Sequence, residues 1–235
     1  MRSAKVAPTR PYRKTKRALS EAETRQRIVE ATVELHETIG PAKTTIKAIA
    51  ERAGVQRATV YNHFPDLQTL FGACSAHYYE RHPMPDPTSW VGIASPTERL
   101  RVALRELYTW YEETEQMLSA GIRDIDAVPP AAREAFFGYF RHVARSLMTG
   151  RRERGRARVR TAAAVGHAIS FVTWHSLARD GSLTSEEVAG LMEAMVAAPA
   201  RSTLVKISAS DSPARNLPLE ADAQADQVQP GLVVN

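Results

Sequence analysis

Cysteine is almost absent from this sequence of 235 residues, in which Cys74 stands alone. One cysteine excludes a disulfide within the chain, and such sparing use is typical of a reducing cytoplasm. No apolar run approaches the ~20 residues that span a bilayer, and the basic start has no apolar segment of the kind found in secretory signals. These absences predict a soluble, cytoplasmic protein that does not associate with membranes.

Motifs of catalytic and metal sites are also missing. The sequence contains no Gly-rich phosphate loop, no G-x-S-x-G and no H-E-x-x-H. Neither His77 with His82 nor His167 with His175 has the i,i+4 spacing that brings two imidazoles to one metal, although i,i+8 keeps the second pair on one helical face. We therefore expect no enzyme, no cofactor and no bound metal, and keep a metal-responsive protein as an alternative.

Positive charge is concentrated in the first 64 residues. They hold 13 Lys/Arg against 6 Asp/Glu, whereas the remaining residues hold 18 against 20. Residues 1–19 contain seven basic residues, no acidic residue and no helical periodicity. The distribution favours a phosphate-bearing partner for this part of the chain and a disordered basic arm over residues 1–19. A merely solubilising tail is the alternative for the arm.

Two short helices joined by a tight turn are predicted in residues 45–64. Apolar residues recur at helical spacing in the first helix, with Thr45 placed to cap its start and Gly54 to end it. In the second helix, Val60 and Phe64 face inward. The side chains left outside are mostly hydrogen-bonding groups, which suit the major groove of DNA better than an ordinary solvated face.

The run TTIKAIAERAGVQRATVYNHFPDLQTLF resembles the DNA-binding signature of the tetracycline-repressor (TetR) family of bacterial transcription regulators. The resemblance covers residues 31–71 and joins an Ile-Ala-x-x-Ala-Gly-Val turn to Thr-Val-Tyr-x-His-Phe. The sequence departs from the family pattern at Leu67, where the family usually has a lysine that holds a phosphate. It departs again at His36, where the family usually has a phenylalanine.

This resemblance implies an all-α fold, in which an N-terminal three-helix helix-turn-helix domain precedes a larger helical ligand-binding and dimerisation domain. We place the DNA-binding domain and its linking helix at residues 20–83, with a Ser-x-x-Glu capping box at Ser20. Pro83, Pro85 and Pro87 follow the linking helix and cannot continue it. The second domain covers residues 84–200, and residues 201–235 have the composition of a disordered tail.

The residues expected to contact DNA lie on the two short helices. Arg57 is suited to donate two hydrogen bonds to a guanine edge, and Asn62 to read an adenine or reach a phosphate. The resemblance implies that Thr45, Tyr61 and His63 hold the DNA backbone. The full set is Thr45, Lys47, Gln56, Arg57, Ala58, Thr59, Tyr61, Asn62 and His63.

One recognition helix covers only a few base pairs of double-stranded DNA, so we expect a homodimer on a palindromic operator. A helix predicted over residues 158–179 is rich in small residues, which permit close helix packing. The resemblance places the last two long helices in the subunit interface. Plain core is the alternative for each interface candidate, and the candidates are Phe171, Trp174, Leu191 and Met195.

Aromatic residues of the second domain are sufficient to wall an apolar pocket. Aromatic residues at helical spacing are also typical of plain core, so both interpretations stay open. The resemblance implies a small-molecule effector that releases a repressor from its operator. A metal-responsive regulator and a nonspecific architectural DNA-binding protein are the alternatives. The pocket candidates are Tyr108, Tyr111, Phe136, Phe137, Phe140 and Trp174.

Overall fold

The computed structural model describes residues 10–201, with side chains for residues 17–198, and all of these fall within one compact unit, Met1–Ser202. Parts of the expected arm (residues 1–9) and tail (residues 202–235) lie outside the described residues. None of the helices described is long and apolar enough to cross a bilayer.

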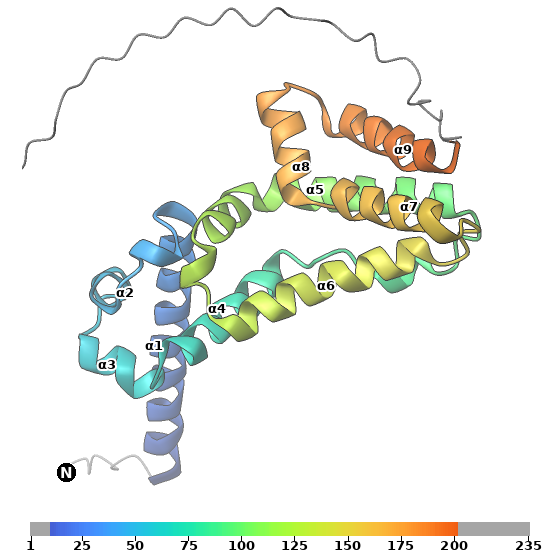
Figure 1. The fold of residues 1–235 in the computed structure, drawn as a ribbon. Helices are drawn as coiled ribbons and strands as arrows, with labels where there is room; N and C mark the ends of the chain where they lie inside the picture. The colour runs from blue at the N-terminus through green and yellow to red at the C-terminus, as the bar shows by residue number, and fades with distance from the viewer. Residues whose placement is uncertain (1–9, 202–235) are drawn as a thin grey trace, which may run out of the picture. The chain divides into compact units, whose positions relative to one another are not determined.

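The described residues form nine α-helices and no strand, which confirms the predicted all-α class (Figure 1). Short 3-10 segments and one π-helical turn connect some of them. The helices are α1 (Arg10–Thr38), α2 (Ile46–Ala53), α3 (Arg57–His63), α4 (Leu67–Arg81), α5 (Pro96–Arg123), α6 (Pro130–Met148), α7 (Gly155–Ala168), α8 (Phe171–His175) and α9 (Ser185–Arg201).

Helix α1 begins at Arg10, so the prediction of a disordered arm is wrong for residues 10–19. The prediction that a capping box at Ser20 starts this helix is also wrong. Ser20 lies inside the helix, where its carbonyl oxygen accepts a hydrogen bond from Thr24 Oγ1 at 2.8 Å. No glycine or proline interrupts residues 12–19, and Lys, Arg and Ala are good helix formers. The exposed pair Arg17–Glu21, at 3.0 Å, adds the i,i+4 contact that favours this extension.

The predicted turn between α2 and α3 is confirmed. Thr45 caps α2 by accepting the backbone N–H of Ala48 at 3.1 Å. Gly54 follows α2 with φ 66° and ψ 40°, the left-handed conformation that costs glycine little. Val60 and Phe64 are 0% and 1% exposed, so α3 is fixed by one buried face and leaves its other face free.

Helix α4 starts where Asp66 accepts the backbone N–H of Thr69 at 2.6 Å. Leu70, Cys74 and Tyr78 are buried along one side, as their spacing predicts. Leu67, which also fits that spacing, is 60% exposed. It is the first residue of the helix, where the chain has only just turned into the core. The exposed Leu67 therefore provides neither core packing nor the charge of a lysine.

Two clusters of buried side chains hold the fold together. The smaller cluster packs the four helices α1, α2, α3 and α4 together around Ile28, Val60 and Leu70. The larger cluster packs the helices from α5 through α9 together around Tyr111 and Trp174, which are both 0% exposed. Each cluster is large enough to hold its own group of helices, and the contacts between the groups are described below.

The helix predicted over residues 158–179 is broken after Ala168. At the break, Tyr108 donates its hydroxyl hydrogen to the carbonyl oxygen of Ala168 at 2.7 Å, and Tyr111 donates to that of Ile169 at 2.5 Å. Because these carbonyl groups bond to tyrosines from α5, the backbone turns at Ser170 and a separate short helix, α8, begins. The cause of the break therefore lies about 60 residues earlier in the chain.

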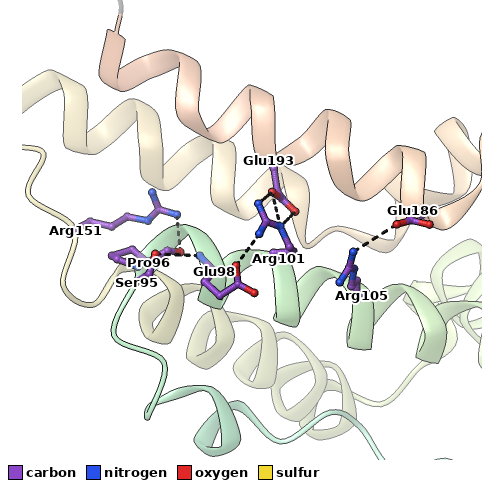
Figure 2. A network of polar contacts seen from close by, with 8 residues as sticks. All are labelled: Ser95, Pro96, Glu98, Arg101, Arg105, Arg151, Glu186 and Glu193. Atoms are coloured by element: carbon purple, nitrogen blue, oxygen red, sulfur yellow. Dashed lines mark hydrogen bonds and ion pairs between the residues drawn. The ribbon is translucent and has the colours of Figure 1, made fainter.

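Polar contacts hold α9 against α5 (Figure 2). Arg101 on α5 pairs with Glu193 on α9 at 3.1 Å, and Arg105 pairs with Glu186 at 3.4 Å. A capping box begins α9, where Thr184 Oγ1 accepts the backbone N–H of Glu187 at 3.2 Å and Glu187 accepts the backbone N–H of Thr184 at 2.8 Å. These contacts fix which face of α9 turns inward.

Candidate functional site

The outer face of α3 carries an exposed group of hydrogen-bonding side chains. Gln56, Arg57 and Asn62 are exposed, and Tyr61 is 56% exposed although it is a large aromatic residue. Among the described residues, no hydrogen bond or ion pair engages the guanidinium of Arg57 or the amide of Asn62. These donors and acceptors are therefore free to meet a partner.

The other expected DNA contacts lie beside this face. Ala58, Thr45 and Lys47 are exposed, whereas Thr59 and His63 are half-buried. Thr45 uses its oxygen as a helix cap, and its hydroxyl hydrogen stays available to an acceptor. The structure thus brings α3 and the start of α2 together on one surface, which we call the α3 surface.

Helix α1 supports this surface from behind. The guanidinium of Arg25 lies 4.6 Å from the ring centre of Phe64, a cation–π contact between α1 and the end of α3. Arg52 on α2 donates from Nε to Glu34 Oε2 at 2.7 Å, which ties α2 to α1. The α3 surface therefore rests on contacts among α1, α2 and the end of α3.

The loop after α1 contacts the end of α5. Arg123 Nη2 donates to the carbonyl oxygen of Ile39 at 3.2 Å, and Asp124 accepts the backbone N–H of Ala42 at 3.1 Å. A hydrogen bond from Arg123 holds the pKa of Asp124 below its usual value. Gly40 lies within this contact with φ 88° and ψ 160°. We call it the Gly40 contact, and it joins the loop between α1 and α2 to the end of α5.

A mainly apolar cavity of about 370 Å³ lies next to the Gly40 contact. Pro41, the residue after Gly40, belongs to its lining. We call it the inner cavity, and its other walls come from α1, α4, α5 and α6. They include His36, Cys74, Tyr78, Met117, Ile122 and Phe136.

A second hollow of about 640 Å³, the outer groove, runs between α6 and the α7–α8 segment. Phe136 lines both hollows, and Phe137 and Phe140 line the outer groove. Three of the six aromatic residues expected to wall a pocket therefore do line a hollow. The outer groove also includes Ile169 and Val172.

The other three expected pocket residues line neither of these two hollows. Tyr108, Tyr111 and Trp174 are at most 1% exposed and belong to the larger core cluster. The hydroxyl groups of both tyrosines bond to backbone carbonyls, and Trp174 Nε1 donates to Ser185 Oγ at 2.9 Å. The polar atoms of these three side chains thus already make hydrogen bonds within the protein.

His36 and Cys74 meet in the wall of the inner cavity. Cys74 Sγ lies 3.5 Å from His36 Nδ1, and the His36 ring lies 5.1 Å from the ring of Phe71. Burial lowers the pKa of His36 to about 4 and raises the pKa of the Cys74 thiol to about 12. Both groups are therefore uncharged at neutral pH. The sequence marked His36 as unusual but did not indicate this contact.

We expect the protein to lose stability in mild acid because of His36. Its folded-state pKa is about 4, below the value of 6.5 expected in the unfolded chain. Between these two values the unfolded state binds a proton that the folded state does not, so stability falls as pH drops. Urea unfolding should show a loss of about 2 kcal/mol from this group between pH 7 and pH 5.

The matched variants for this prediction are His36→Phe and His142→Gln. His36→Phe removes the buried imidazole and should remove this part of the acid sensitivity. His142 is exposed on α6, so its replacement should leave the acid sensitivity assigned to His36 in place. An unaltered pH dependence in His36→Phe would contradict the assignment to His36.

The four candidate interface residues differ in exposure. Leu191 is 47% exposed on α9, and Met195 is half-buried. Phe171 and Trp174 are 7% and 0% exposed and lie in the core of the chain itself. Other exposed residues of α7 and α9 are small or apolar and were not among the four interface candidates; they include Val159, Ala162, Ala163, Gly166, Gly190 and Ala194.

The histidines considered as metal ligands have other neighbours. His167 Nδ1 lies 3.2 Å from Thr173 Oγ1, and His175 Nε2 lies 3.5 Å from Glu115 Oε1. His77 Nδ1 lies 3.4 Å from Gln26 Nε2. No group of three possible metal-binding side chains occurs in the part of the chain that the structure describes.

Residues 28–74, which contain α2, α3 and the start of α4, match the family described as "Bacterial regulatory proteins, tetR family". The HTH-type transcriptional regulator SrpR of Pseudomonas putida is 37% identical over 90 residues, which cover 38% of this chain and 41% of SrpR. The uncharacterised HTH-type transcriptional regulator TtgW, also of P. putida, is 37% identical over 90 residues, which cover 38% of this chain and 66% of TtgW. The chain thus spans less than two thirds of either relative.

Solved structures share the fold at low sequence identity. PfmR, a TetR family regulator from Thermus thermophilus, has a TM-score of 0.53 at 19% identity, covering 72% of this chain and 96% of PfmR. NalD of Pseudomonas aeruginosa, the secondary repressor of the MexAB-OprM efflux pump, gives the same score and identity and covers 77% of this chain and 96% of NalD. The likeness extends beyond the α1–α4 region.

Proposed function

Because the chain belongs to the tetR family of bacterial regulatory proteins, we propose that it is a transcriptional repressor that binds a palindromic operator and leaves it when a small molecule binds. In this proposal α1 to α4 bind DNA, with the boundary at the end of α4, and α5 to α9 bind the effector and the second subunit. Regulators of this family are transcription factors and not enzymes.

The exposed side chains of α3 carry the proposal. Val60 and Phe64 anchor this helix, while Arg57, Tyr61 and Asn62 project from the opposite side. A helix presented in this way fits the major groove, where arginine reads guanine and asparagine reads adenine. Thr45 and Lys47 lie at the start of α2, where they are suited to phosphates. The α3 surface thus combines side chains suited to base edges with side chains suited to the phosphates of the DNA backbone.

Selection of genomic fragments by the purified chain tests operator binding. The retained fragments should share an inverted repeat whose two halves are related by the twofold axis of a dimer. Scrambling one half should weaken binding by at least about tenfold, because half of the base contacts are lost. Binding that is unchanged by this scrambling would contradict the palindrome, and equal affinity for random DNA would support an architectural role instead.

We assign the subunit interface to the exposed face formed by α7 and α9. Leu191 on α9 and Val159 on α7 are 47% and 57% exposed, and small residues such as Ala163 and Gly166 are exposed on α7. Exposed apolar side chains among small residues let two helix pairs approach closely. A second copy of the chain offers the same face, which suits a twofold contact.

Leu191→Arg should therefore convert the dimer to a monomer, because two charged side chains would meet near the twofold axis. Sedimentation velocity measures the change, and affinity for the full operator should fall by at least about tenfold as the second half-site is lost. Val91→Arg is the matched control, since Val91 is 67% exposed in the segment before α5. A dimeric Leu191→Arg would contradict this interface.

The inner cavity is the proposed effector site. Its lining includes Phe71, Cys74 and Tyr78 of α4, and α4 begins directly after the turn that follows α3. Pro41 of the Gly40 contact also belongs to the lining. A ligand that binds more tightly to one position of α4 shifts the dimer toward that position and so changes the separation of the two α3 helices. Operator affinity then falls by at most the ratio of the ligand's affinities for the two positions. Operator affinity that is indifferent to every compound bound in the cavity would contradict release.

A further inference from the structure

We infer that the inner cavity takes an apolar molecule carrying one acidic group, that Arg133 binds this group, and that cations are rejected. The inference rests on the proposed effector site and specifies the chemical class of the effector. It comes from the kinds of side chain that line the cavity and from the single charge among them.

The lining contains no negative charge. Among the described residues that line the inner cavity, none is an aspartate or a glutamate. Its polar groups include the imidazole of His36, the thiol of Cys74 and the phenols of Tyr78 and Tyr79. A cationic ligand would lose its hydration and find no carboxylate to replace it, which makes its binding unfavourable.

Arg133 is the only lysine or arginine in the lining of the inner cavity, as far as residues 17–198 are concerned. It lies near the start of α6, and its side chain is 34% exposed. Its ion-pair partner is Asp126, with 3.9 Å between Arg133 Nη1 and Asp126 Oδ1, and the Asp126 side chain is fully exposed. Such a pair contributes little, so the guanidinium keeps donors for a carboxylate of the ligand.

The size of the cavity limits the rest of the ligand. A volume of about 370 Å³ lies at the lower end of the range for small-molecule sites and holds one or two fused rings. Met117, Ile122 and Phe136 provide apolar walls from α5 and α6. A ligand held by Arg133 on α6 and packed against α4 would connect the two helices, as an effector must.

Three naphthalene probes of nearly the same size test this inference by calorimetry on the full chain without DNA. They are naphthalene-2-carboxylate, naphthalene-2-carboxamide and 2-naphthylmethylammonium. The carboxylate should bind about fivefold more tightly than the carboxamide, the gain of one partly exposed ion pair. The ammonium compound should bind at least about tenfold more weakly than the carboxamide.

Variants of two arginines show where the acidic group lies. In Arg133→Gln, carboxylate binding should fall to the carboxamide level while carboxamide binding stays the same, and Arg133→Lys should retain part of the preference. Arg141→Gln is the matched control, because Arg141 is an exposed arginine of α6 that lines the outer groove. It should leave all three affinities unchanged.

Several results would overturn the inference. They are tight binding of the ammonium probe, a carboxylate preference that survives Arg133→Gln, equal loss of all three probes in that variant, or no binding of any probe. Operator release is measured separately. Selective binding without release would contradict only the proposed regulation, whereas release by an unrelated cation would contradict only this ligand class.

Discussion

Gly40→Ala lowers the free energy of unfolding by about 3 kcal/mol, because alanine tolerates neither the backbone conformation nor the space at this position. Gly40 has φ 88° and ψ 160°, a region that residues with a Cβ atom rarely adopt. An added methyl carbon would lie 2.0 Å from Arg123 Nη2 and 2.2 Å from Asp124 Oδ2. Both atoms are side-chain ends that would have to move away, which would disturb the hydrogen bonds of the Gly40 contact.

Urea unfolding at pH 7 measures this effect, and Gly72→Ala is the matched control. Gly72 lies in the interior of α4, and a Cβ atom there would meet nothing within 4 Å. Removing a helical glycine should raise stability by about 0.5–1 kcal/mol. The two Gly→Ala changes should therefore have opposite signs. Equal stabilities of Gly40→Ala and the unchanged protein would contradict the strain assigned to Gly40.

The helix-turn-helix region could be predicted from the sequence because its signals are local. Thr45 caps α2 and Gly54 ends it, and each acts within a few residues of its own position. Val60 and Phe64 face inward through simple helical spacing. The family resemblance covers the same stretch, so motif and periodicity predicted the same helices.

Features that depend on distant residues could not be predicted in this way. The break after Ala168 is caused by hydroxyl groups of Tyr108 and Tyr111 on another helix. Arg99 is 5% exposed, and its guanidinium donates hydrogen bonds to backbone carbonyls that include that of Thr149, at 2.8 Å. Nothing near Arg99 in the sequence indicates that partner. Such contacts exist only once several helices have packed.

The residues that line the candidate pocket also could not be predicted from the sequence alone. Aromatic content selected Phe136, which lines both hollows. It also drew attention to Tyr111 and Trp174, which are core residues. Residues of the inner cavity such as His36 and Met117 come from different helices, and no spacing along one helix brings them together. Their shared site becomes visible only in the folded structure.

The α3 surface is the central claim of this account, and the double variant Arg57→Ala, Tyr61→Ala tests it most directly. Both side chains are exposed, so the free energy of unfolding should change by less than about 0.5 kcal/mol. Loss of a guanine contact worth ~1–3 kcal/mol and of a phosphate contact worth ~1 kcal/mol should weaken operator binding by about 100-fold.

Arg145→Ala is the control for lost charge, because Arg145 is an exposed arginine on α6, outside both the α3 surface and the proposed interface. It should retain operator affinity within about threefold, as a charge far from the DNA contributes little to binding. The deciding measurement is the ratio of operator affinity to random-DNA affinity at one fixed salt concentration. We predict that this ratio collapses in the double variant and persists in Arg145→Ala. A double variant that keeps the ratio of the unchanged protein would contradict the claim that α3 reads DNA.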